Sequence, residues 1–152
     1  MNTLGITEKI EYRKFDIAIA QLFEAISMFI NKKFLLSISL AGASEEIFAG
    51  LLKIKDEQPI IEKSISRIEE LRKNTDFSVM GKKNKRDIIR EWNHVKNRTK
   101  HHDKDEGEFI SFNACDEAYW LIKRALENAK QLGVNINNEQ EFDNFIIINV
   151  CL

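Results

Sequence analysis

Apolar residues recur every three or four positions along most of this chain, and that spacing is typical of helices that bury one face. Between Phe15 and Phe29, for example, isoleucine and leucine continue such a stripe. Similar stripes run through four later segments, each of which ends near a polar or glycine-containing stretch. The pattern predicts five main helices, over residues 7–31, 34–55, 59–74, 84 to at least 98, and 113–133.

The ends of the predicted helices carry local signals. Asn113 is a good N-cap, and Gly133 is suited to end the same helix. Pro59 favours a first helical turn. Residues 109–112 favour an extended piece, whereas the apolar tail over 139–152 is compatible with a helix or a strand. A tail this apolar should be packed, and a partner subunit is one candidate to cover it.

The centre of the second predicted helix is rich in small residues. Gly42 and Gly50 lie there, although a glycine inside a helix costs about 1 kcal/mol relative to alanine. A neighbour packed closely against this stretch would offset that cost. Glu45 and Glu46 lie in the same stretch, so at least one of them is expected near the packed side. The simplest role for that one is a hydrogen bond or ion pair at a helix crossing; the functional role is to support a site by pairing with basic residues of the fourth helix.

The length of 152 residues fits one domain over 1–152 that can bury a core without disulfides or a metal. A single proline and six glycines favour helices over strands and turns. We therefore expect an all-α, up-and-down bundle of four or five main helices. The sequence shows no secretory signal and no uninterrupted apolar run of about 20 residues, so we expect a cytoplasmic protein that does not enter a membrane.

Charge is distributed unevenly, although the net charge is only −1. Residues 82–104 hold nine Lys and Arg against three Asp and Glu, a net charge of +6, whereas residues 105–152 hold three against nine, a net charge of −6. The pattern fits a site for a polyanion. It fits equally well two surfaces that pair with each other, within one chain or across a dimer. The simplest interpretation of the basic block is a solvated helix end that complements the helix dipole.

All three histidines, His94, His101 and His102, lie inside the basic block. Histidine moves protons readily near neutral pH, and neighbouring Lys and Arg side chains can hold a phosphate. Together they supply what acid–base cleavage of a phosphodiester needs. A metal site made of the histidines and nearby acidic residues is an alternative. Because no ligand spacing typical of zinc is present, we expect no metal and no other cofactor.

The segment from Lys96 to His101 resembles the motif of the HEPN superfamily of helical-bundle proteins, which is an arginine, an adjacent polar residue and a histidine after four to six intervening residues. Asn97 matches the polar residue and His101 the histidine, whereas Lys96 replaces the arginine. The expected all-α bundle is also similar over most of the chain, while the motif covers six residues. Lysine keeps the charge of arginine but lacks its bidentate fork, which weakens catalysis more than phosphate binding.

The resemblance implies a homodimer in which two motifs face one cleft. Many members of the family are metal-independent ribonucleases, often in toxin–antitoxin or defence systems, and others bind nucleotides or protein partners without catalysis. In a ribonuclease of this kind, His101 would act as general acid or base and Lys96 would stabilise the charged phosphorane. Asn97 would orient the histidine or the phosphate. The ribose 2′-hydroxyl would attack, and a cyclic phosphate would remain.

The sequence is therefore compatible with two functions. The first is an RNA- or nucleotide-binding module, with or without ribonuclease activity. The second is a non-catalytic interaction bundle, such as an antitoxin-like or adaptor protein, whose basic fourth helix meets an acidic partner. Around the motif, phosphate contacts are expected from Arg98, Lys100 and His102, and support for the site is expected from Glu45, Glu46 and His94.

Overall fold

The chain is all-helical in the part that the structure describes. The computed structural model describes residues 9–75, 81–101 and 103–150, and no strand occurs within these ranges. The predicted all-α bundle is therefore confirmed. The helices found there are α1 (Lys14–Ile30), α2 (Phe34–Ile54), α3 (Ile60–Asn74), α4 (Lys85–Trp92), α5 (His94–Lys100), α6 (Ala114–Gln131) and α7 (Glu139–Val150).

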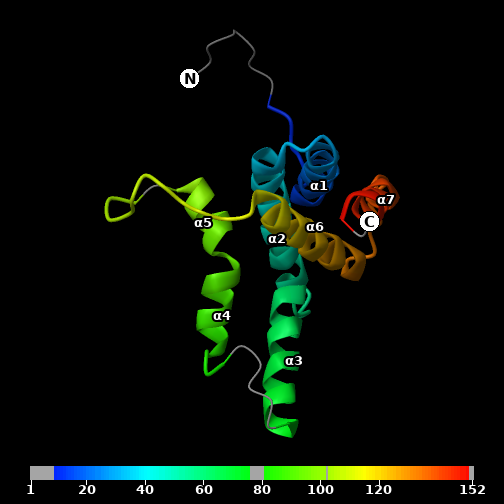
Figure 1. Ribbon diagram of the computed structural model, residues 1–152. Coiled ribbons are helices and arrows are strands. Elements are labelled where there is room, and N and C mark those ends of the chain that lie inside the picture. The colour runs from blue at the N-terminus through cyan, green and yellow to red at the C-terminus, as the bar shows by residue number, and fades with distance from the viewer. Residues whose placement is uncertain (1–8, 76–80, 102, 151–152) are drawn as a thin grey trace.

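The central helix of the bundle is α2. α1 packs along it, α6 crosses it, and α7 lies against α1 (Figure 1). The apolar stripes of these four helices meet in one core, because each helix turns its apolar face inward. Phe29 is fully buried there, and its ring lies 5.2, 5.1 and 5.7 Å from those of Phe34, Phe142 and Phe145.

Two serines allow α1 and α2 to approach each other closely. Ser37 Oγ donates to Ala25 O at 2.8 Å, and Ser44 Oγ donates to Ala18 O at 2.8 Å. Both serines are fully buried. Their small side chains let the two backbones come together, and carbonyls of the neighbouring helix satisfy the buried hydroxyl groups. The small residues of α2 are thus explained in part by its contact with α1.

By length and composition alone, α2 is also the one helix among the described residues that could cross a membrane. In the bundle, 44% of its most apolar window is buried. The core helix of a soluble protein has the same composition, so this feature does not determine where the protein resides.

The prediction of one continuous fourth helix is wrong, because the segment is broken at Asn93 into α4 and α5. Arg124 of α6 reaches the break. Its Nη1 donates to Trp92 O at 3.3 Å, and its Nη2 donates to Asn93 Oδ1 at 2.8 Å. A backbone carbonyl at the break therefore accepts a hydrogen bond from a side chain of α6. Neither proline nor glycine marks this position, so the local sequence carries no sign of it.

α3 and α4 form an arm that extends away from the four-helix core (Figure 1). A second, smaller cluster of buried apolar residues holds the two helices together. It consists of Ile61, Ile65 and Ile88, and Trp92 packs against it. The arm places the basic residues of α4 outside the main core.

The other boundaries differ little from the prediction, except near the N-terminus. Residues 9–13 are not helical and α1 begins at Lys14, whereas the predicted start near residue 7 lies outside the described residues. The apolar tail is helical as far as it is described, with Phe145 packed on the core and Ile147 exposed. Residues 109–112 form no strand.

The first amide of α3 is capped by a distant helix. The N-cap residue, Pro59, has no polar side chain, and Asn128 Oδ1 on α6 accepts instead from Ile60 N at 2.8 Å. Asn128 is fully buried. This bond therefore attaches the arm to the core and also satisfies a helix end.

We expect Asn128→Ala to lower the free energy of unfolding by about 1–3 kcal/mol, because the helix-terminal amide loses its acceptor. Urea unfolding followed by circular dichroism measures the loss. Asn135→Ala, at an exposed position, is the control and should stay within about 0.5 kcal/mol of the parent chain. Equal stability of the two variants would contradict the role given to Asn128.

Candidate functional site

Lys96 points against the centre of α2 and not into solvent. Its side chain is 5% exposed. The stem passes so close to Gly42 that a Cβ added there would lie 2.9 Å from Lys96 Cγ. Because glycine has no Cβ, α5 can cross α2 at this distance. The small residues of α2 predict a close neighbour. Lys96 is that neighbour at Gly42, and α1 is a second one at the serines.

The Lys96 ammonium group lies between two carboxylates of α2. Its Nζ is 2.9 Å from Glu45 Oε2 and 3.1 Å from Glu46 Oε1. Glu45 is buried and also lies 3.3 Å from Arg124 Nη2, while the half-exposed Glu46 lies 3.1 Å from Lys100 Nζ. We call these five residues the ionic cluster. One of the two glutamates was expected to pair with the basic segment; both do, and the cluster joins α2, α5 and α6.

The ionic cluster shifts the acidity of its outer carboxyl. Burial by itself would raise the pKa of Glu46, but the hydrogen bonds and charges of Lys100 and Lys96 outweigh it and lower that pKa. A carboxyl whose pKa is lowered on folding stabilises the fold above its ordinary pKa and loses this contribution as the pH falls through the lowered value. The contact between Glu46 and the two lysines is therefore maintained at neutral pH and weakens only in acid.

The residues that resemble the catalytic motif do not meet on one open surface. Lys96 is buried in the ionic cluster, whereas Asn97 and His101 are exposed. His101 is the C-cap of α5, and its backbone amide donates to Asn97 O at 3.2 Å. These two residues lie one turn apart at the end of the helix. Lys96, which stands in place of the arginine of the motif, is enclosed by carboxylates and does not face His101's open surface.

The secondary candidates have contacts within the chain. Arg98 Nε lies 3.1 Å from Glu106 Oε2, and its Nη2 donates to Gly107 O at 3.2 Å. Arg98 therefore fastens the following loop to α5. Lys100 belongs to the ionic cluster, and His102 lies outside the described residues.

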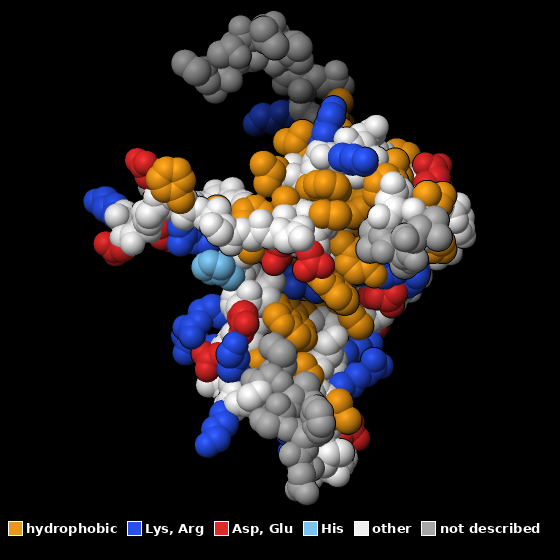
Figure 2. Space-filling view, in the orientation of Figure 1, with side chains coloured by type: hydrophobic (Ala, Val, Ile, Leu, Met, Phe, Trp, Pro, Cys, Tyr) orange, Lys and Arg blue, Asp and Glu red, His pale blue; other side chains and the backbone are white. Residues whose placement is uncertain are grey.

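Carboxylates of the same chain neutralise most of the basic block. Six of its nine Lys and Arg side chains lie within 4.0 Å of a carboxylate oxygen. Within the described ranges, those without such a partner are Lys82, Arg86 and Lys104. Figure 2 shows Lys and Arg side chains gathered over α4 with acidic ones among them. The surface is therefore mixed in charge, whereas polyanion binding favours a continuous cationic track.

His94 lies apart from the other candidates, in an open cleft of about 670 Å³ between α4 and the start of α6. One wall is a stripe of charged residues on α4. The opposite wall consists of residues 111–113 and Glu117. We call this space the α4–α6 cleft. Sequence reasoning did not single out Glu117 or Arg124, because both follow the basic block by a long interval and only the tertiary fold brings them to it.

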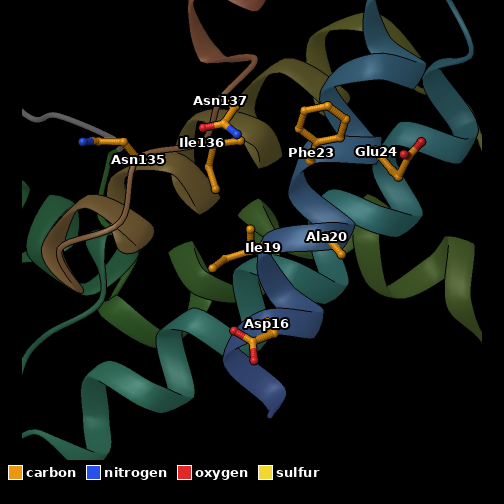
Figure 3. A pocket seen from close by; sticks show the side chains of 8 residues that line it. All are labelled: Asp16, Ile19, Ala20, Phe23, Glu24, Asn135, Ile136 and Asn137. Carbon is orange, nitrogen blue, oxygen red and sulfur yellow. The ribbon is translucent and has the colours of Figure 1, made fainter. Parts of the chain in front are cut away.

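A second hollow, of about 330 Å³, lies between α1 and residues 135–137 (Figure 3). Ile19 and Phe23 make part of its wall apolar, and its two carboxylates, Asp16 and Glu24, lie well apart in Figure 3. In the part of the chain that the structure describes, no group of three or more His, Cys, Asp or Glu side chains could hold a metal ion. The polar groups that line this hollow therefore do not converge on one point, as a catalytic or metal site would require.

Comparison with known proteins does not assign the chain to a family. No protein-family model, no curated protein and no solved structure matches it. The HEPN resemblance therefore stays a prediction from the residues, and the interpretation of the site rests on its geometry.

We expect Gly42→Ala to lower the free energy of unfolding by about 1–3 kcal/mol. The new methyl group would meet the stem of Lys96, and two carboxylates hold the far end of that side chain. Thermal and urea unfolding measure the loss.

Gly50→Ala is the matched control in the same helix. Nothing lies within 4 Å of a Cβ added at Gly50, and alanine favours a helix, so this variant should gain up to about 1 kcal/mol. If both alanine variants are stabilised, the close approach of Lys96 to α2 is not required.

Proposed function

We propose that the chain is a non-catalytic, HEPN-like binding module that acts by docking a partner protein. The observation that supports this proposal is the burial of Lys96, whose ammonium group lies within 3.1 Å of both Glu45 and Glu46. A ribonuclease of this kind needs a cation that is free to meet the charged phosphorane. Drawing Lys96 out to a substrate would break a buried ion pair, at a cost of about 3–5 kcal/mol.

Exposed apolar side chains also support a protein partner. Phe109 is 90% exposed, and Trp120 is 56% exposed. Aromatic residues are enriched in the centres of protein interfaces. Four of the five charged side chains on α4 pair with an opposite charge of the same chain, which suits a partner surface of both signs better than a polyanion. An antitoxin-like or adaptor role fits such a module.

RNA or nucleotide binding without cleavage is the second candidate. It is favoured by the exposed end of α5, where Asn97 and His101 lie one turn apart, and by the side chains of Lys82, Arg86 and Lys104. If these three cations neutralised three phosphates of a single strand, log Kd would rise with log salt at a slope of about 2. Fluorescence anisotropy of a labelled RNA over a range of salt concentrations measures this slope. A slope near zero would remove this candidate.

The catalytic alternative is tested with purified protein and RNA in EDTA. We expect no cleavage by the wild-type chain and none by Lys96→Arg, because the arginine would meet the same two carboxylates. His101→Ala is the matched control, and chromatography detects the cyclic phosphate product. Metal-independent cleavage by the wild-type chain that His101→Ala abolishes would overturn the proposal of a non-catalytic module.

A further inference from the structure

The α4–α6 cleft contains a carboxylate that has no partner among the residues that the structure describes. Of the charged residues that line the cleft, Lys83 pairs with Glu91, and Arg90 pairs with Asp87 at 2.9 Å. Glu117 is partly buried in the opposite wall. Its carboxylate makes no ion pair and no hydrogen bond with any residue that the structure describes.

The surroundings of Glu117 make this arrangement unfavourable for the free chain. Burial, and then the neighbouring Asp116, raise the pKa of the Glu117 carboxyl, while Arg124 and His94 act in the opposite direction without cancelling the effect. An unpaired carboxylate in a concave, partly buried position is typical of a place where a ligand completes the contacts.

The charge of the lining decides which ligand fits. Two cations and three carboxylates line the cleft, and both cations are paired, so Glu117 carries the one unpaired charge among these five residues. This unpaired negative charge favours a cation over a phosphate. Phe112, which is partly buried, lines the same cleft as Glu117. An aromatic ring and a carboxylate in one cleft suit a flat cation. Such a cation can stack on the ring and donate two hydrogen bonds to the carboxylate.

We propose that the α4–α6 cleft binds the guanidinium group of an arginine side chain of the partner protein, with the Glu117 carboxylate as its acceptor and the Phe112 ring beside it. This inference rests on the proposed function, because it supplies the contact by which that partner docks. Arginine fits better than lysine, since its planar fork matches a carboxylate and stacks on a ring. The volume of about 670 Å³ also leaves room for the peptide that carries the side chain.

Titration of the isotope-labelled full chain with N-acetyl-arginine methylamide tests the proposal by NMR. The amides of Val95, Ser111 and Asn113, which line the cleft, should shift and saturate with a dissociation constant on the order of 1 mM. The capped citrulline analogue has nearly the same shape without the charge and should not bind. The capped lysine analogue should bind several-fold more weakly. Equal binding of the arginine and citrulline probes, or shifts elsewhere in the chain, would overturn the proposal.

Glu117→Gln should weaken binding of the capped arginine at least about 10-fold, because it removes the charge and one acceptor oxygen. Glu141→Gln makes the same chemical change at an exposed position of α7 and should leave the affinity unchanged. Equal affinity in the two variants would contradict the role of Glu117.

Stability separates a binding role of Glu117 from a merely structural one. A carboxyl whose pKa is higher in the folded chain than in the unfolded chain stabilises the fold when protonated, and this contribution is lost as the pH rises through that pKa. Glu117→Gln should therefore melt at the same temperature as the parent chain or higher at pH 7, and the difference should disappear in acid. A lower melting temperature at pH 7 would identify Glu117 as a structural residue and overturn the proposal.

Different experimental outcomes would overturn the proposed function and the proposed arginine site. A chain that neither cleaves RNA nor binds the capped arginine would overturn the arginine site and leave the non-catalytic module standing. Metal-independent cleavage that depends on His101, with arginine bound at Glu117, would overturn the module and support the site.

Discussion

The arrangement of the helices depends on the contact in which the side chain of Lys96 lies across the backbone of α2 at Gly42. Since glycine has no side chain there, α5 approaches α2 and places an ammonium group between two carboxylates of that helix. Arg124 shares one of these carboxylates, and its remaining hydrogen bonds reach the backbone and side chain at the break after α4. The ionic cluster therefore holds α2, α5 and α6 together, and through Arg124 it contacts the break at which α4 ends.

Buried ion pairs constrain a fold more than they stabilise it. Taking several charges out of water is costly, and their mutual attraction does little more than offset that cost. Removing one member, however, leaves an uncompensated charge, so arrangements of the helices that separate Lys96 from Glu45 and Glu46 are disfavoured. This constraint explains why a segment that resembles a ribonuclease motif supplies a structural contact here. Of the three residues that match the motif, Asn97 and His101 stay at the surface.

The pairing of charges also indicates where ligands can act. Most basic residues between positions 82 and 104 meet a carboxylate of the same chain, so little of their charge is available to an external anion. Glu117 is the opposite case, because it lines a cleft and has no partner among the described residues. A group that folding leaves unsatisfied is where binding gains the most, since a ligand there relieves a cost that the free protein carries.

The sequence by itself determined the approximate extents of most helices, because apolar spacing and caps such as Asn113 act over a few residues. It also indicated a close neighbour for the small residues of α2 and a pairing for one of Glu45 and Glu46. Only the tertiary structure decided that Lys96 is that neighbour, that the fourth helix breaks at Asn93, and that Glu117 shares a cleft with His94. These features arise from contacts between segments tens of residues apart, and such contacts leave no local pattern of residues.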